Sequence, residues 1–342
     1  MLINELLLHK DVNKNRGLNM TLIKFYDQMF PLQDNETVLD GLLRNGVDIP
    51  HGCRAGACQA CVLQVNEGEV PAKAQTGLKT TRKELGYFLS CQCAPTAPIE
   101  VRFAEQGLAR ATAEIIAAEK ISPHILRLRL SKVLDFHAGQ YLNIWHETAE
   151  KNLIRSYSIA SLPHENFIEL HIKIIANGKF SQWAAEHLRE GDNLAVQGPL
   201  GDCFYSAGDI HQPLLCIGIG TGLAPLYGVI RDALHQGHLG KIHLILGARE
   251  STGFYLRNEL ADLQHTYPQV DIHFVCQSQD AHPGDIGETD IYQFVKAKFS
   301  STKGMRAYLC GADTFVHKMK KQIFLSGANM ADIHADAFLP CS

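Results

Sequence analysis

The sequence predicts a multidomain chain whose three regions belong to different fold classes. A cysteine-rich segment lies in the first third, a strand-rich stretch begins near Ala109, and apolar strands alternate with helical patterns from Pro213 onward. The strand-rich stretch favours an antiparallel β-barrel, and the later alternation favours an α/β domain with helices on both faces of a parallel sheet. A length of 342 residues suits two or three such domains.

The cysteine-rich segment has the spacing of an iron–sulfur site. Cys53, Cys58 and Cys61 are separated by four and two residues, and 29 residues separate Cys61 from Cys91. This is the plant-type spacing for a 2Fe-2S cluster, and the small residues between the cysteines suit a tight loop whose backbone N–H groups point inward. The alternatives are a four-thiolate zinc site, which would want two closely spaced cysteine pairs, and a set of unliganded loop cysteines.

The fourth cluster ligand follows from a resemblance. In the stretch SCQC, either Cys91 or Cys93 could reach the cluster. The cysteine-rich segment resembles plant-type ferredoxins, which implies Cys91 as the ligand and an α+β β-grasp fold. Residues 37–46 predict the helix that covers such a sheet, with Thr37 as a plausible N-cap and a glycine at the end.

Composition excludes several classes of partner. The formal net charge of −4 gives no electrostatic case for binding nucleic acid or an anionic membrane surface. No apolar run approaches the roughly 20 residues that span a bilayer, and the N-terminal stretch lacks the pattern of a signal peptide. We therefore expect a cytoplasmic protein without membrane insertion, in which ten cysteines are not a disulfide framework.

The remaining elements follow from apolar runs bounded by turn residues. Five segments predict strands of a barrel: 111–121, 125–131, 139–147, 154–161 and 167–178. Four short apolar strands and two helical patterns predict the α/β region: strands 214–220, 242–248, 271–276 and 307–312, and helices 223–237 and 255–267. The expected organisation is an N-terminal extension at 1–19, a 2Fe-2S domain at 20–106, a barrel at 107–209 and an α/β domain at 210–342.

Three short motifs follow one another along the chain, and their order indicates the family. RSYS at 155–158, GKFSQW at 178–183 and GIGTGLAP at 218–225 follow the cysteine segment along the chain. With them the chain resembles the ferredoxin-NADP reductase superfamily, and more closely its oxygenase-reductase members, in which a plant-type ferredoxin domain precedes a flavin domain and a nicotinamide domain. The resemblance implies an FAD-binding antiparallel β-barrel and an α/β parallel-sheet NAD-binding domain.

The first two motifs imply a flavin site. By resemblance, Arg155 neutralises the flavin pyrophosphate, Tyr157 packs on the isoalloxazine and Ser158 hydrogen-bonds near flavin N5. Taken alone, RSYS reads as an ordinary exposed strand with a buried tyrosine. The second motif is a glycine loop that opens a helix, whose N-terminus can receive the pyrophosphate. Its expected cofactor-binding residues are Gly178, Lys179, Phe180 and Ser181.

The third motif implies a nicotinamide nucleotide site. It follows an apolar strand and opens a helix, so that glycines let the backbone approach a pyrophosphate. Its expected cofactor-binding residues are Gly218, Gly220, Thr221, Gly222 and Pro225. Arg249 ends the next strand, where the adenosine ribose should lie, but Glu250 follows at once and the next cation is Arg257. A 2′-phosphate clamp therefore looks incomplete, which favours NADH over NADPH.

Two positions near the C-terminus carry weaker expectations. By resemblance, Cys310 and Gly311 lie beside the nicotinamide, and Cys310 together with Ser158 is expected to shape the site of hydride transfer. The alternative for Cys310 is a small buried cysteine that ends a strand. Phe338 is expected to shield the flavin, although its segment could equally be the last edge strand.

The implied function is electron transfer from NADH through FAD and a 2Fe-2S cluster to a separate acceptor protein. A flavin takes a hydride and releases electrons singly, whereas the cluster accepts one at a time. The expected acceptor is an oxygenase or hydroxylase component. The alternatives are an electron supplier to a deoxysugar dehydratase, similar to CDP-glucoseen reductases, and a non-catalytic redox-sensing module.

Overall fold

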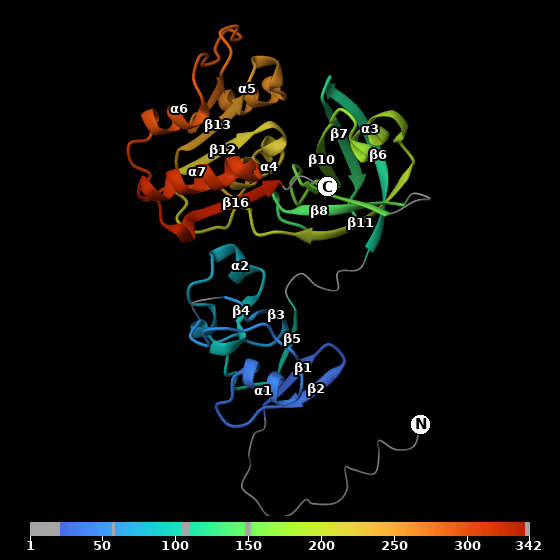
Figure 1. Ribbon diagram of the computed structural model, residues 1–342, viewed down its shortest axis with the longest axis vertical. Coiled ribbons are helices and arrows are strands. Elements are labelled where there is room, and N and C mark those ends of the chain that lie inside the picture. Colours follow the sequence, from blue (N-terminus) through green and yellow to red (C-terminus); the bar gives the residue numbers. More distant parts are fainter. Residues whose placement is uncertain (1–20, 57–58, 104–109, 148–151, 339–342) are drawn as a thin grey trace, which may run out of the picture. The chain divides into compact units, whose positions relative to one another are not determined.

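The computed structural model describes residues 21–56, 59–103, 110–147 and 152–338. Contacts divide the chain into two compact units, the first formed by Met1–Leu78 with Leu85–Ala104 and the second by Lys79–Glu84 with Glu105–Ser342. The first unit holds one sheet, and the second holds the remaining two sheets (Figure 1). The exact domain boundaries stay predictions.

The first unit is a five-stranded mixed sheet with the order β2-β1-β5-β3-β4. Strands β1 and β5 are parallel, and the other pairs are antiparallel. The strands are β1 (Leu22–Phe25), β2 (Gln28–Pro31), β3 (Val62–Glu67), β4 (Tyr87–Leu89) and β5 (Ile99–Phe103). The short helical segments of this unit are α1 (Val38–Arg44), η1 (Ala72–Gln75) and η2 (Ser90–Gln92), whereas α2 (Thr80–Glu84), between η1 and β4 in the chain, belongs to the second unit. This is the predicted β-grasp arrangement.

Helix α1 forms where the sequence predicts it. The Thr37 side chain accepts a hydrogen bond from the Asp40 N–H at 3.1 Å, which satisfies one of the free donors of the first turn. Leu39 and Leu42 are fully buried against the sheet, and each such side chain stabilises the fold by ~1.5–3 kcal/mol. The chain leaves the helix through Gly46, whose positive φ suits the turn.

Six antiparallel strands form the barrel of the second unit, in the order β10-β7-β6-β11-β8-β9. Its elements are β6 (Arg110–Ser122), β7 (Ile125–Ser131), β8 (Tyr141–Glu147), β9 (Asn152–Ser158), β10 (Phe167–Lys173), α3 (Lys179–His187) and β11 (Asn193–Leu200). An antiparallel bridge between Ile159 and Leu170 connects the ends of the sheet and closes the barrel. The five predicted strands are all present.

The α/β part of the second unit is a five-stranded parallel sheet with the order β14-β13-β12-β15-β16. Its elements are β12 (Leu214–Ile219), η3 (Gly220–Gly222), α4 (Leu223–His235), β13 (Ile242–Ala248), η4 (Ser251–Gly253), α5 (Arg257–Thr266), β14 (Val270–Cys276), α6 (Ile291–Lys298), β15 (Arg306–Ala312), α7 (Asp313–Leu325), η5 (Met330–Asp332) and β16 (Ile333–Phe338). Strand order reverses between β12 and β15, which makes a topological switch point there.

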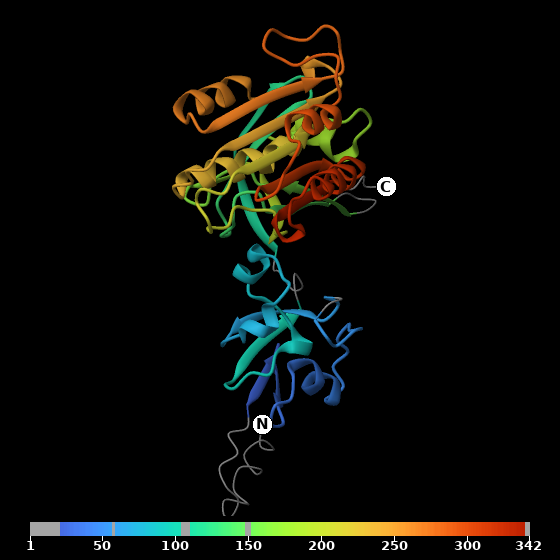
Figure 2. The ribbon, with the colours of Figure 1, turned by 90° about the vertical axis from the view of Figure 1, so that its left-hand side faces the viewer.

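Alternating side chains give the parallel sheet two cores. Leu214 and Leu244 point into one core, covered by α4 and α5, whereas Leu215 and Ile245 point into the other, covered by α6 and α7. Figures 1 and 2 show the helices on the two faces of this sheet. The central strand β12 (LLCIGI) is apolar along its whole length, as a strand of a parallel sheet that is buried on both sides requires.

Candidate functional site

The predicted cluster ligands converge only partly in the described residues. Cys61 begins the approach to β3, and Cys91 lies in η2. Ser90 holds these two segments together, because its N–H and its hydroxyl both donate to the Cys61 carbonyl, at 3.1 and 2.8 Å. Burial raises the pKa of the Cys61 thiol, and the adjacent Cys91 thiol raises it further. The predicted ligand Cys58 lies outside the described residues.

Cys91 and Cys93 both belong to the apolar core cluster of the first unit, and the more deeply buried of the two is Cys93. It is fully buried in the apolar core of the first unit, and its carbonyl accepts the Val38 N–H at 2.7 Å, which anchors the start of α1. Burial raises the pKa of the Cys93 thiol to about 12. The Cys91 sulfur instead receives the Gln92 side-chain amide at 3.7 Å. The choice of Cys91 over Cys93 stays a prediction that this packing supports.

Residues 53–56, in the loop before Cys61, have backbone features that suit a cluster-binding loop. Gly56 has a φ of +81°, and a Cβ built there would lie 3.2 Å from Cγ of Gln92, so the loop packs closely on η2. The Ala55 N–H points at the exposed Cys53 sulfur, at 3.4 Å. Donors aimed at sulfur and a glycine at a close approach fit an anionic iron–sulfur centre. No set of three metal-binding side chains occurs within the described residues, which leave out Cys58.

The expected flavin residues lie on β9 and at the start of α3. Tyr157 is half-buried, with its ring centroid 5.7 Å from that of Phe180. The Arg155 guanidinium donates to the Ile154 carbonyl at 2.8 Å, and no carboxylate pairs with it in the described ranges. An arginine that no described carboxylate engages, two residues from a half-buried tyrosine on the same strand, fits a phosphate-bearing flat cofactor.

The α3 N-terminus has no side-chain cap. Gly178 is its N-cap residue, and a Cβ there would lie 2.5 Å from the Ser181 hydroxyl, so glycine is required. Ser181 accepts the Ile175 N–H at 3.1 Å and thereby fixes the turn before the helix. Lys179 is the first residue of the helix. The uncapped first turn leaves N–H donors for an anion such as a pyrophosphate.

The glycine motif lies at the switch point of the parallel sheet. Gly218 ends the buried part of β12 opposite Cys310 of β15, and Gly220 to Gly222 form the η3 turn that leads into α4. A Cβ on Gly222 would lie 2.1 Å from the Cys310 carbonyl oxygen, so this loop can approach β15 only with glycine there. Thr221 lies in the same turn, and Pro225 in the first turn of α4.

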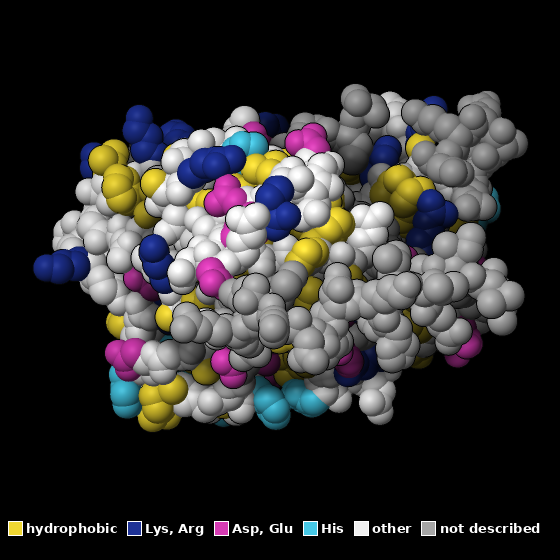
Figure 3. All heavy atoms as spheres, turned by 90° about the horizontal axis from the view of Figure 1, so that it is seen from below, with side chains coloured by type: hydrophobic (Ala, Val, Ile, Leu, Met, Phe, Trp, Pro, Cys, Tyr) yellow, Lys and Arg dark blue, Asp and Glu magenta, His cyan; other side chains and the backbone are white. Residues whose placement is uncertain are grey.

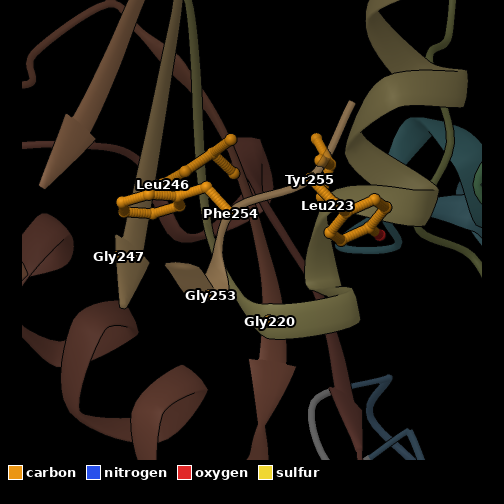
Figure 4. Close-up of a pocket in the computed structure, with 7 residues that line it drawn as sticks. All are labelled: Gly220, Leu223, Leu246, Gly247, Gly253, Phe254 and Tyr255. Carbon is orange, nitrogen blue, oxygen red and sulfur yellow. The ribbon is translucent and has the colours of Figure 1, made fainter. Parts of the chain in front are cut away.

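A pocket opens beside this turn. It is lined by Gly220, Leu223, Leu246, Gly247, Gly253, Phe254 and Tyr255. Figure 4 shows the Phe254 ring beside Leu246 and, across the pocket, Tyr255 beside Leu223. Gly220 has a positive φ, and nothing lies within 4 Å of a Cβ built there, so the turn leaves space. Crevices at the carboxyl ends of strands, next to the switch point, are where open α/β sheets bind nucleotides.

A buried network joins this pocket to the barrel. The Tyr255 hydroxyl and His171 Nδ1 of β10 are 3.1 Å apart, and His171 Nε2 lies 3.1 Å from Glu169. Burial alone would raise the pKa of Glu169, but the hydrogen bonds from His171 and Arg129 outweigh it and lower that pKa to about 2. An ionised carboxylate can only accept a hydrogen bond, so His171 Nε2–H donates to Glu169 and holds the imidazole ring beside the Tyr255 hydroxyl.

Cys310 and Phe338 occupy well-defined places in the parallel sheet. The Cys310 side chain is fully buried, and its sulfur lies 3.9 Å from that of Cys203. Gly311 follows with a φ of +144°. Phe338 ends β16, the edge strand, opposite Ala312 of β15, and is half-buried. The expected roles of Cys310 at the nicotinamide and Phe338 at the flavin stay predictions.

Asp336 is a functional candidate that the sequence did not single out. It pairs with Cys310 in the β15–β16 register, and it accepts a hydrogen bond from the Ser158 hydroxyl at 2.7 Å. Burial raises the pKa of Asp336 to about 6. An acid inside the apolar strand IHADAF was the available signal, but only the tertiary pairing places it against Ser158, the residue expected near flavin N5.

Asp336→Asn is expected to gain stability relative to the native chain as the pH rises. An acid whose pKa is raised by folding stabilises below its unfolded value of 3.8, and this contribution is lost as the pH passes 6. A shift from 3.8 to about 6 corresponds to at most about 3 kcal/mol. The melting-temperature difference between variant and native chain, measured from pH 4 to pH 8, should therefore grow by several degrees. A melting-temperature difference for Asp336→Asn that stays constant over this pH range would contradict the assignment.

Comparison with known proteins places three domain families along the chain. Residues 24–96 match the 2Fe-2S iron-sulfur cluster binding domain, residues 112–205 the oxidoreductase FAD-binding domain, and residues 216–321 the oxidoreductase NAD-binding domain. The three matches follow the predicted order and confirm the predicted fold classes and the cofactor set of a 2Fe-2S cluster, FAD and a nicotinamide nucleotide.

Similar proteins extend over nearly the whole chain. The reductase component of the naphthalene 1,2-dioxygenase system of Pseudomonas putida is 31% identical over 93% of this chain and 98% of its own length. A reductase component of the naphthalene 1,2-dioxygenase/salicylate 5-hydroxylase systems of a Ralstonia species is 30% identical over 90% of this chain and 95% of its own length. The crystal structure of the Amycolatopsis cytochrome P450 reductase has a TM-score of 0.65 at 28% identity, and the match covers 94% of this chain and 100% of that one.

Within the described residues, no helix is both long and apolar enough to cross a membrane.

The order of cofactor domains and the full-length relatives agree with the barrel, the parallel sheet and the glycine turn seen in the structure. The chain therefore belongs to the family of reductase components that combine a 2Fe-2S ferredoxin domain with FAD-binding and NAD-binding domains, and it is an NAD(P)H-dependent flavin and iron–sulfur oxidoreductase that transfers electrons.

Proposed function

We propose that the chain takes electrons from NADH in the cytoplasm and delivers them to a separate oxygenase or hydroxylase component. The observation that carries this proposal is the match along 98% of the length of a dioxygenase-system reductase component, with all three cofactor domains in the same chain. When bound, FAD accepts a hydride and releases electrons singly to a one-electron 2Fe-2S cluster.

The residues of the chain have positioning tasks in this proposal. Cys53, Cys58, Cys61 and Cys91 would hold the cluster. Arg155, Tyr157 and the α3 N-terminus would hold FAD, with the Ser158 hydroxyl oriented by Asp336 at 2.7 Å. The turn from Gly220 to Gly222 would receive the nucleotide pyrophosphate, and Tyr255, held by His171, would keep the pocket wall in place against the barrel.

Charge supports a protein acceptor over nucleic acid. The net charge is −4, and acidic and basic side chains are interspersed among the coloured residues on the face shown in Figure 3. Nucleic-acid binding favours a continuous basic surface. A transient acceptor protein needs only a modest complementary surface.

The preference for NADH has two supports. Exposed Glu250 directly follows exposed Arg249 at the end of β13, so a negative charge stands beside the nearest cation. The next cation, Arg257, is engaged in an ion pair with Asp285 at 2.7 Å. A 2′-phosphate is normally held by several unpaired donors.

An anaerobic titration with NADH tests the relay. The purified protein should combine flavin absorption with the broad absorption of a 2Fe-2S cluster, and reductant should bleach it with about three electrons per chain, two for flavin and one for the cluster. NADH-dependent reduction of a purified oxygenase component then tests the acceptor. A protein that binds neither FAD nor iron and sulfide on reconstitution would overturn the proposal, and equal kcat/KM for NADPH and NADH would overturn the nucleotide preference.

Arg155→Ala is expected to purify with little FAD. Loss of charge-assisted hydrogen bonds to a phosphate costs ~1.5–3 kcal/mol, or roughly ten- to a hundredfold in affinity. Flavin content per chain, measured by absorbance after denaturation, gives the answer. Lys173→Ala removes an exposed cation at the end of β10 and should retain full FAD content. Normal flavin content in Arg155→Ala would remove Arg155 from the pyrophosphate site.

A further inference from the structure

In the loop between β14 and α6, the Asp285 carboxylate accepts hydrogen bonds from two neighbouring side chains, Arg257 and Ser251. The Asp285 side chain is only 1% exposed. Its two oxygens accept from Arg257 Nη1 at 2.8 Å and Nη2 at 2.7 Å, and one oxygen also accepts from the Ser251 hydroxyl at 2.5 Å. Burial alone would raise the pKa of Asp285, but the hydrogen bonds from Arg257 and Ser251 outweigh it, so this pKa is lowered. Asp285 is therefore ionised at neutral pH.

Arg257 is fixed on three sides. Its fork binds Asp285 in the bidentate geometry that a phosphate would otherwise receive. Its guanidinium carbon lies 5.2 Å from the Phe254 ring centroid and 4.5 Å from that of Phe274, and Nη2 donates to the Ser251 carbonyl at 3.3 Å. The arginine has no conformational freedom to leave the carboxylate without losing these contacts.

The Ser251 hydroxyl is also fully engaged in hydrogen bonds. Its hydroxyl proton goes to Asp285, while its oxygen accepts the His282 N–H at 2.9 Å. The serine thus ties η4, which follows β13, to the loop that carries Asp285. A hydroxyl that already donates to a buried carboxylate cannot donate to a ligand phosphate at the same time.

These side chains belong to the segment that borders the nucleotide pocket. Gly253 and Phe254, which line the pocket, lie between Ser251 and Arg257 in sequence. In open α/β sheets, the loop after the second strand faces the adenosine ribose, and β13 is the second strand here. A cation and a hydroxyl in this loop are the groups that would bind a 2′-phosphate.

We propose that Asp285 determines the nucleotide preference of this chain, because it holds Arg257 and Ser251 away from the 2′-phosphate of NADPH and adds negative charge beside it. This inference rests on the proposed preference for NADH and on binding of the nucleotide at this pocket. Asp285 acts through its two partners and is a positioning residue. While Asp285 binds Arg257, the exposed Arg249 is the remaining cation in the described part of this loop that could contact a phosphate, and it lies next to Glu250.

Kinetics with both nucleotides test the proposal on the holoprotein, with ferricyanide as acceptor. Asp285→Asn keeps a side chain of the same size and one acceptor oxygen but loses the charge. We expect kcat/KM for NADPH to rise about tenfold or more, the worth of one recovered charge-assisted contact, while kcat/KM for NADH stays within about threefold. Asp280→Asn removes an exposed carboxylate from the same loop and should change neither value.

A double variant tests whether Arg257 is responsible for the gain in kcat/KM for NADPH. In Asp285→Asn with Arg257→Ala, the NADPH gain should disappear. A gain that persists without Arg257, or an unchanged NADPH to NADH ratio in Asp285→Asn, would overturn the proposal. FAD content and melting temperature show whether each variant folds. If turnover is impaired, calorimetry compares the affinity for adenosine 2′-monophosphate with that for adenosine 5′-monophosphate, and Asp285→Asn should favour the 2′-phosphate. A native chain that oxidises neither nucleotide would contradict the proposed function itself, a result separate from all of these.

Discussion

Replacement of Cys91 by serine is expected to abolish the 2Fe-2S cluster, whereas replacement of Cys93 by serine should leave it in place. One residue separates the two cysteines and both are buried, but Cys91 lies against the Cys61 thiol, whereas Cys93 is fully enclosed by the apolar core. In Cys91→Ser the broad visible absorption and the iron content should fall to near zero. Reduction of cytochrome c should fall with them, because one-electron acceptors of this kind are expected to draw on the cluster.

The NADH:ferricyanide activity of Cys91→Ser should remain within about twofold of the native value, since ferricyanide can take electrons from the flavin. Cys93→Ser places a hydroxyl in the core and should lower the melting temperature of the first unit, by an amount that corresponds to ~1–3 kcal/mol. Loss of iron in Cys93→Ser with retention in Cys91→Ser would reverse the ligand assignment. Equal loss of both activities in Cys91→Ser would contradict the order of the relay.

Features that depend on local sequence were predictable. The cysteine spacing, the helix capped by Thr37 and the glycine turn before α4 each occupy a short segment whose residues dictate its conformation. The strands of the barrel and the parallel sheet were also predictable, because apolar runs and turn residues mark them. The order of the three motifs along the chain then sufficed to predict the family.

Features that depend on tertiary pairing were not predictable. Asp336 meets Ser158 across 178 residues of sequence, and its local signal, an acid inside an apolar strand, does not indicate which residue it faces. The same holds for His171 and Tyr255, which belong to the barrel and to the parallel-sheet region. Arg257 was visible in the sequence as the next cation after Arg249, but only the fold shows that Asp285 already occupies it. Segments distant in the chain create these contacts, and the contacts set pKa values and orient hydroxyls.

Gly222→Ala is expected to reduce NADH-dependent activity by about a hundredfold or more while FAD and the cluster are retained. The backbone of Gly222 has a φ of −59°, which any residue can adopt, so the requirement for glycine is steric. An added Cβ would lie 2.1 Å from the Cys310 carbonyl oxygen and 2.5 Å from its carbon, both backbone atoms. The turn would have to move away from β15 at the switch point, and a displacement of about 1 Å can cost a hundredfold in rate.

The matched control is Gly237→Ala at the end of α4. Gly237 has a φ of +82° with nothing within 4 Å of an added Cβ, so this substitution strains the backbone by ~1 kcal/mol but moves no part of the pocket. Its activity should match that of the native chain. Steady-state NADH:ferricyanide assays, with flavin content and dithionite reduction of the flavin measured in parallel, separate nucleotide binding from loss of cofactor. Native activity in Gly222→Ala would show that the turn does not contact the nucleotide. Loss of FAD in the same variant would show instead that the close approach of the turn to β15 supports the fold of the whole second unit.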